Sequence, residues 1–171
     1  MGGCGYKSDA NFLAKELQKY SLQFKKAYGY SIPSKLMVRH AADLAQIATQ
    51  KASQRPLGVT CFFLCDQKPP LNEISLIRVD PTGQIFDLWG GAAGKEMNES
   101  IKWLQQKHDL TGDSCFKGDW EECALLCLKC LEHKNKTISK RQGGKLEKFK
   151  DKEIEVLVWV EGKEPRILTQ E

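Results

Sequence analysis

The sequence predicts an α+β fold built in layers rather than a doubly wound parallel sheet. Two helical patterns open the chain, three strand-like segments with a tight hairpin follow, and two more helical patterns precede two short strands. Paired helices that flank antiparallel hairpins are typical of layered α+β architectures. A length of 171 residues suits one hydrophobic core. We therefore expect a single domain over residues 1–171.

The first two helices are predicted from apolar residues that recur at helical spacing. The first is expected over residues 9–28, with Ser8 or Asp9 as its cap and Gly29 as its end. Pro33 is expected in the first turn of the second helix, where its missing N–H would have had no partner. The apolar residues on these faces are Leu13, Leu17, Tyr20, Phe24 and Ala27 in the first helix, and Met37, Ala41, Leu44 and Ala48 in the second.

Three strands are predicted between the two pairs of helices. Residues 57–66 are rich in strand-forming side chains and apolar on both faces, which indicates a buried strand. Residues 74–79 and 84–89 flank the turn Asp80–Gly83, whose second residue is proline and whose fourth is glycine. Type I and type II turns accept proline and glycine at these places, so the two strands are expected to form a hairpin.

The C-terminal half is predicted to hold two further helices, at about 95–107 and 119–133. The segment 134–152 is Lys-rich and contains Gly143-Gly144, so it is expected to be a loop, with 134–148 as a charged insertion. The remaining elements are expected to be a strand over 153–160 and a short strand over 166–168.

Composition excludes several classes of protein. No apolar run approaches the roughly 20 residues that a membrane helix needs, so no membrane segment is expected. The net charge of +4 arises mostly from the basic segment, where Phe149 alone offers an aromatic ring, so no nucleic acid is expected as a partner. The seven cysteines are an odd number, and the first residues lack the basic and apolar regions of a secretory signal. We therefore expect a reducing compartment, the cytoplasm or the nucleus.

The cysteines are the strongest candidates for a metal or redox site. Cys123, Cys127 and Cys130 share one face of a predicted helix, and the last two form a CxxC pair. Zinc sites draw such pairs from turns, and no second close pair is present, while a thioredoxin motif would stand at a helix start. Packing in the core is the favoured interpretation, with metal or redox chemistry as the alternative. The histidines, His40, His108 and His133, show no ligand spacing, so neither a metal nor a cofactor is expected.

Motifs of catalytic sites are missing from the sequence. Neither a GxSxG nucleophile elbow nor a papain-like cysteine context occurs. The glycine-rich run Gly90–Gly94 precedes a predicted helix, but it lacks the Lys and Ser/Thr of a phosphate-binding loop. We therefore expect no catalytic residue and no cofactor-binding residue.

Several strings resemble the motifs of one protein family. Gly5–Asn11 is similar to G-[LM]-x-A-D-[AS]-R, Tyr28–Pro33 to YGYEIP, Ala42–Gln50 to ADxxQxYTQ, and Arg55–Val59 to RP[FL]GV. Further matches in the same order are Asp80–Gly83 to DP[AS]G, Ala92–Leu104 to AAGxxxxEAxxFLE, Phe149–Val156 to FKPTEIEV and Arg166–Thr169 to RILT. By these strings the chain resembles proteasome alpha subunits, closest to the eukaryotic type-six alpha subunit. It departs from the pattern at Asn11, where the family has Arg, and at Ala48, where it has an aromatic residue.

The resemblance implies a fold and a place in an assembly. The fold is the four-layer αββα sandwich of the N-terminal nucleophile hydrolases, here expected to be N-terminally incomplete because the family's early strands and gating tail have no counterpart. The chain is thus interpreted as a truncated gene model, a fragment or a divergent paralogue. The implied function is that of a non-catalytic structural subunit in the 20S alpha ring. The implied partners are other alpha subunits, beta subunits and the regulatory particle.

Two other function classes stay open from the sequence, besides a truncated paralogue with no assembled role. A beta-like threonine protease would need a free N-terminal threonine, but the first threonine is Thr49, inside a predicted helix. A small binding module could use the cysteine helix and the basic loop. The positions that the resemblance singles out as structural or interface residues are Gly5, Asp9, Tyr28, Gly29, Tyr30, Pro33, Asp43, Gln46, Thr49, Gln50, Arg55, Pro56, Gly58, Asp80, Pro81 and Gly83.

Overall fold

A computed structural model describes residues 1–66, 74–108, 118–142, 154–160 and 163–168. The chain divides into two compact units, an N-terminal unit, Met1–Leu88, and a C-terminal unit, Trp89–Glu171. Both units combine helices with antiparallel strands, so the predicted α+β class is confirmed at that level. The four-layer arrangement stays a prediction.

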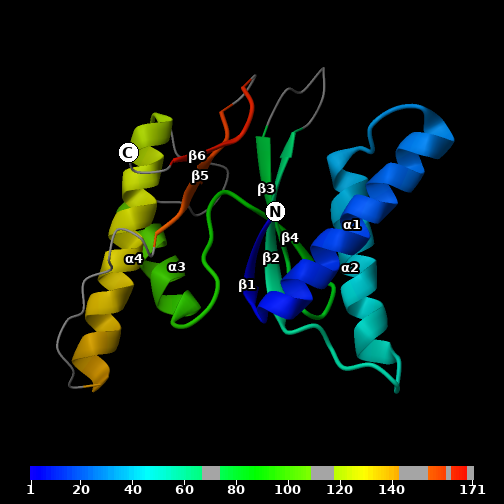
Figure 1. The fold of residues 1–171 in the computed structure, drawn as a ribbon. Helices are drawn as coiled ribbons and strands as arrows, with labels where there is room; N and C mark the ends of the chain where they lie inside the picture. The colour runs from blue at the N-terminus through cyan, green and yellow to red at the C-terminus, as the bar shows by residue number, and fades with distance from the viewer. Residues whose placement is uncertain (67–73, 109–117, 143–153, 161–162, 169–171) are drawn as a thin grey trace. The chain divides into compact units, whose positions relative to one another are not determined.

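The N-terminal unit is a four-stranded antiparallel sheet with two helices on one face (Figure 1). The strands lie in the order β1-β2-β3-β4, so strands that follow one another in the sequence are also paired in the sheet. The helices are α1 (Lys7–Tyr28) and α2 (Ser34–Gln50), and the strands are β1 (Gly2–Gly5), β2 (Val59–Asp66), β3 (Ile74–Val79) and β4 (Ile85–Leu88).

The core of this unit lies between the helices and one face of the sheet. Alternate residues of β2 are buried there, because side chains of a strand point to opposite faces in turn. The other face of β2 is less covered, with Leu64 37% exposed, so the expectation of burial on both faces is wrong at that position. The buried cluster comprises Leu13, Leu17, Val38, Ala41, Ala42, Val59, Cys61, Phe63, Cys65, Ile77 and Val79.

The two helices differ from the predictions at their first residues. α1 begins at Lys7 with Tyr6 as its N-cap and no side-chain cap, so the expected capping by Ser8 or Asp9 is wrong. The Asp9 carboxylate is bound elsewhere, as described below. Pro33 is the N-cap of α2 rather than a first-turn residue. Gly29 does end α1, in a left-handed conformation with φ 78°, and its N–H donates to the Lys25 carbonyl at 2.9 Å.

β1 was not predicted as a separate strand, because glycine is depleted in strands and three of its four residues are glycine. It forms through its partner: Gly2 lies opposite Phe62, and Gly5 lies opposite Val59. The hairpin of β3 and β4 is confirmed, with Leu76 opposite Leu88.

The C-terminal unit contains two helices and a two-stranded antiparallel sheet. A small buried cluster of Leu104, Leu126 and Cys130 joins the helices, and Trp103 packs against it. The predicted strand over 153–160 is shorter than expected, and the predicted strand over 166–168 is confirmed. The elements are α3 (Met97–His108), α4 (Trp120–Gln142), β5 (Val156–Val158) and β6 (Arg166–Leu168).

The basic segment is partly helical. α4 continues to Gln142, so the predicted loop over 134–152 is wrong for residues 134–142. Lys, Arg and Gln are good helix formers, and the first glycines of the segment come only at Gly143-Gly144. The rest of the predicted insertion, and residues 109–117 between α3 and α4, lie outside the described residues.

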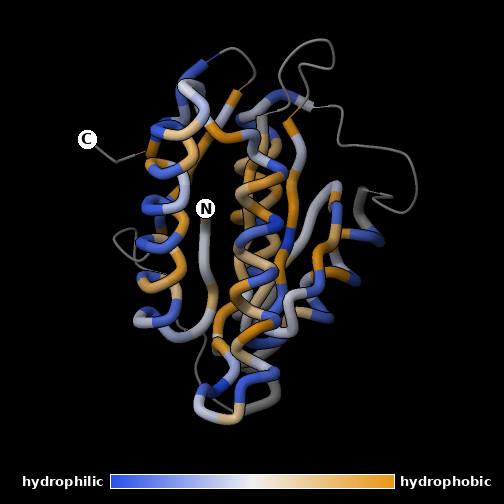
Figure 2. Tube along the Cα trace, turned by 90° about the vertical axis from the view of Figure 1, so that its right-hand side faces the viewer, coloured by the Kyte–Doolittle hydropathy of each residue, from blue (hydrophilic) through white to orange (hydrophobic). Residues whose placement is uncertain are grey.

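Hydrophobic and hydrophilic residues alternate along the helices (Figure 2), as expected for helices that cover a core on one side. Within the described ranges, none of the helices combines the length and apolar character that crossing a membrane requires.

Candidate functional site

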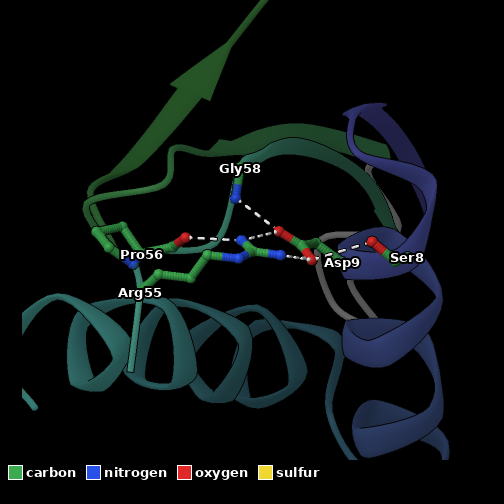
Figure 3. A network of polar contacts seen from close by, with 5 residues as sticks. All are labelled: Ser8, Asp9, Arg55, Pro56 and Gly58. Atoms are coloured by element: carbon green, nitrogen blue, oxygen red, sulfur yellow. Dashed lines mark hydrogen bonds and ion pairs between the residues drawn. The ribbon is translucent and has the colours of Figure 1, made fainter. Parts of the chain in front are cut away.

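Two of the motif positions, Asp9 in α1 and Arg55 in the loop that precedes β2, form an ion pair (Figure 3). Arg55 Nη1 lies 2.7 Å from Asp9 Oδ2, and Arg55 Nη2 lies 2.8 Å from Asp9 Oδ1. The Gly58 backbone N–H also donates to Asp9 Oδ2, at 2.8 Å. This two-pronged geometry is the strongest form of Arg–carboxylate pairing, so it fixes the start of α1 against the start of β2.

The same contacts set the charge of the pair. The hydrogen bonds from Arg55 and from the Gly58 N–H hold the pKa of Asp9 well below its ordinary value. The Asp9 carboxylate in turn raises the pKa of Arg55. Asp9 is 5% exposed, and both of its oxygens accept strong hydrogen bonds. A carboxylate of this kind is a poor general base, because a base needs a pKa near the working pH and a free lone pair.

Two glycines allow the backbone to close around this pair. The Tyr6 N–H donates to the Gly58 carbonyl at 2.9 Å. Gly5 has φ 140°, and a Cβ there would meet the same carbonyl oxygen. A Cβ on Gly58 would lie 2.5 Å from a Tyr6 ring carbon. Tyr6 also lies beneath the Arg55 guanidinium, 5.8 Å from its ring centroid. Close backbone approach therefore requires glycine at position 5, and the Tyr6 ring occupies the space that a side chain at position 58 would need.

The hairpin turn forms a second contact between motif positions. The Gly83 N–H donates to the Asp80 carbonyl at 2.9 Å, which closes the predicted turn. Gly83 has φ 83°, and a Cβ there would lie 2.6 Å from the Ala42 carbonyl oxygen and 2.9 Å from Gln46 Cβ. The turn thus rests directly on α2. Asp80 Oδ1 lies 3.0 Å from Arg78 Nε, which holds the turn to its own strand.

An aromatic cluster marks the C-terminal end of α1. The Phe24 ring lies 4.5 Å from the Tyr28 ring and 5.3 Å from the Tyr30 ring, measured between centroids. Tyr28 and Tyr30 are both exposed. The left-handed turn at Gly29 places the two tyrosines beside the same phenylalanine.

The remaining motif positions add local contacts or lie at the surface. Asp43 forms an exposed ion pair with Arg39, at 3.6 Å. The Thr49 hydroxyl donates to the Gln46 carbonyl at 2.6 Å, so it serves its own helix. Arg55 Nη1 donates to the Pro56 carbonyl at 3.1 Å. Gln50 is exposed, Pro33 caps α2, and Pro81 lies in the turn.

Sequence reasoning identified these positions but missed which of them meet. Asp9 and Arg55 are 46 residues apart, and the sequence offers no signal that pairs them. Tyr6 was not singled out, although its ring lies against both Gly58 and Arg55. Whether the positions act in an interface stays a prediction.

Six of the seven cysteines lie among the described residues, three of them buried and three exposed, Cys4 among the latter. Cys61, Cys65 and Cys130 are buried, as predicted for core packing, and burial raises the pKa of Cys61 and Cys65. Cys123 and Cys127 are exposed, so core packing is wrong for these two. The buried stripe of α4 centres on Leu126 and Cys130, and 100° per residue carries positions 123 and 127 to its edge.

The described residues offer no metal cluster. Among them, no group of three or more His, Cys, Asp or Glu side chains could hold a metal ion. The histidines serve packing instead: His40 stacks on Tyr20 at 3.9 Å, and His133 stacks on Trp103 at 5.6 Å, between ring centroids. The His108 side chain lies outside the described residues.

Comparison with known proteins gives consistent matches. The chain is 33% identical over 126 residues to "Proteasome subunit alpha type-2" of Dictyostelium discoideum, which covers 73% of this chain and 51% of that protein. It is 33% identical over 110 residues to "Proteasome subunit alpha type-6" of Caenorhabditis elegans, covering 61% and 43%. It is 30% identical over 115 residues to "Probable proteasome subunit alpha type-1" of Schizosaccharomyces pombe, covering 64% and 46%. The chain thus spans about half the length of these curated relatives.

The family match covers most of the chain. Residues 1–142 match the family described as "Proteasome subunit". This stretch includes the Asp9–Arg55 pair, the hairpin turn on α2 and the whole of α4. The chain therefore belongs to the proteasome subunit family, and the relatives named above are alpha-type subunits.

Proposed function

We propose that the chain is a non-catalytic structural subunit of the alpha ring of the 20S proteasome. The proposal rests on one observation: residues at the alpha-type motif positions bind one another inside the N-terminal unit. Asp9, Arg55 and Gly58 bind one another, and Gly83 rests on α2. These contacts make a rigid helix-on-sheet unit, which is what a ring subunit needs to present surfaces to its neighbours.

The finer parts of the proposal follow from the family. The chain forms one domain with the four-layer αββα sandwich of the N-terminal nucleophile hydrolases. It binds other alpha subunits, beta subunits and the regulatory particle, and it acts in the cytoplasm and the nucleus. In the ring it supports assembly, the docking of regulators and the admission of substrates. The type-six position is favoured by the YGYSIP string at Tyr28–Pro33, which differs from YGYEIP at one residue.

Absence of peptide hydrolysis is the first expected result. The purified chain should not release fluorophore from peptide substrates above a buffer control. A threonine protease needs a hydroxyl beside a free amine, whereas the Thr49 hydroxyl is bound to the Gln46 carbonyl within α2. Turnover that is lost on a single Thr, Ser or Cys→Ala change would instead support the beta-like alternative.

Binding to other alpha subunits is the second expected result. When it is co-expressed with a tagged set of alpha subunits, the chain should co-purify with them through size exclusion. Arg39→Ala serves as a matched control, because this exposed residue makes only a long ion pair within α2 and should not alter recovery. Recovery of the chain solely as free protein would contradict the assembly proposal.

A further inference from the structure

The last strand of the N-terminal sheet has a free edge. β4 (Ile85–Leu88) ends the order β1-β2-β3-β4, so it pairs with β3 on one side only. Within the described residues, no strand lies on its other side. An edge of this kind presents unpaired backbone N–H and C=O groups, to which another extended chain can add as a strand.

The hydrogen bonds of the hairpin show which residues face the free edge. The Asp80 N–H donates to the Gln84 carbonyl at 3.0 Å, so this pair is hydrogen-bonded. Hydrogen-bonded and non-hydrogen-bonded pairs alternate along an antiparallel ladder, so Phe86 is hydrogen-bonded to β3 as well. Ile85 and Asp87 fall between such pairs. Their N–H and C=O groups therefore point away from β3, toward the free edge.

The side chains of the same two residues line a pocket against α2. The partners of Ile85 and Asp87 on β3 are Val79 and Ile77, which are buried under the helices. Side chains of paired residues share one face of a sheet, so Ile85 and Asp87 lie on the face that α2 covers. The pocket has a volume of about 310 Å³, and its apolar wall includes Val38, Ile77 and Ile85. A side chain of an added strand on this face would enter the pocket.

The charge at this edge selects the strand that can bind. Asp87 has no hydrogen-bond or ion-pair partner among the described residues, so its carboxylate can pair with a cation. A strand with an apolar residue opposite it would cover the carboxylate without a partner, which costs free energy. β4 itself contains no basic residue, so a second copy of the chain does not meet this requirement. Ile85 is 37% exposed beside the apolar wall of the pocket, where an aliphatic side chain would cover it.

We propose that the free edge of β4 binds an extended peptide segment of another protein as an added antiparallel strand. The peptide places a basic side chain opposite Asp87 and a branched apolar side chain opposite Ile85. Because the two strands run in opposite directions, its sequence reads basic, any residue, branched apolar. Backbone hydrogen bonds to Ile85 and Asp87 supply the affinity, and the two side chains supply the specificity.

Two cationic residues also line the pocket. Arg39 is already paired with Asp43, at 3.6 Å. Lys35 is exposed and has no ion-pair partner within the described ranges, so its charge opposes the basic side chain of the peptide. Lys35→Gln should therefore tighten the binding of the peptide about twofold.

The test uses the full chain and a capped, fluorescein-labelled peptide, Ser-Thr-Lys-Thr-Val-Thr-Ser, whose binding is followed by fluorescence anisotropy. Wild type should bind it about tenfold more tightly than the same peptide with Glu in place of Lys. Asp87→Lys should reverse this preference. Glu16→Lys makes the same change of charge on α1 and should leave the preference as in wild type. A preference that Asp87→Lys does not change, or no binding of the Lys peptide, would overturn the proposal.

Two methylated peptides separate strand addition from simple attraction between charges. N-methylvaline in place of Val lacks the N–H that donates to the Ile85 carbonyl, while the charge and the side chain stay the same. This peptide should bind about tenfold more weakly than its parent. The same methyl group on the Thr between Lys and Val, whose N–H points away from β4, should have little effect. Equal binding of the parent and the N-methylvaline peptide would show that no strand is added to β4.

Discussion

Replacing Gly83 by alanine is expected to lower the free energy of unfolding by about 3 kcal/mol. The left-handed φ of 83° disfavours any residue with a Cβ, and this Cβ would lie 2.6 Å from the Ala42 carbonyl oxygen. That oxygen belongs to the backbone of α2, so it cannot turn away as a flexible side chain could. Urea denaturation of the full chain, followed by helical circular dichroism, measures the change.

Gly29→Ala is the matched control for this prediction. Gly29 has a similar φ of 78°, but a Cβ there would meet nothing within 4 Å. It should therefore cost only the conformational strain, about 1 kcal/mol. Equal losses in the two variants would mean that the hairpin turn does not rest on α2.

Breaking the Asp9–Arg55 pair is expected to give the second large effect. Arg55→Ala would leave the buried Asp9 carboxylate with the Gly58 N–H as its remaining strong donor. Asp9→Ala would take the acceptor away from the Gly58 N–H and leave Arg55 with the Pro56 carbonyl. Each variant should lower the Tm by roughly 5 °C or more. The double variant should lose much less than the sum, because both single changes break the same interaction.

Two controls define this result. Arg39→Ala breaks the exposed, 3.6 Å pair with Asp43 and should hardly move the Tm. The stability that the Asp9 carboxylate contributes should also depend on pH, in a direction that its pKa determines. Since its pKa is depressed in the folded state, its contribution is complete above its ordinary value of about 3.9 and is lost as the pH falls further. The Tm difference between wild type and Asp9→Ala should thus shrink below about pH 4, and a constant difference would contradict the ionised pair.

The local elements could be predicted from sequence because their signals are local. Gly29 ends α1, and the turn Asp80–Gly83 joins β3 to β4, since each depends on residues adjacent in the chain. β1 escaped prediction because its glycines have no strand preference of their own and are ordered by pairing with β2. Residues 134–142 were misjudged because net charge was weighed above helix propensity.

The sequence motifs identified the residues of the site, but they did not show which of these residues contact one another. The family strings pointed to Asp9, Arg55 and Gly58, yet a helix cap was the natural interpretation of an Asp near a helix start. Tertiary structure overrides it, because Arg55 satisfies both oxygens of the carboxylate. The exposure of Cys127 likewise depends on which stripe of α4 is covered, and helical spacing alone does not determine that.

The proposed place of this chain in a proteasome ring can be tested in the cells that produce it. The most direct test is native mass spectrometry of proteasomes isolated through a tag on this chain from the cells that produce it. We expect an intact particle that contains the tagged chain together with other alpha subunits and beta subunits, and that hydrolyses peptides through the beta subunits. Isolation of the tagged chain free of any other proteasome subunit would show that it is not a ring subunit.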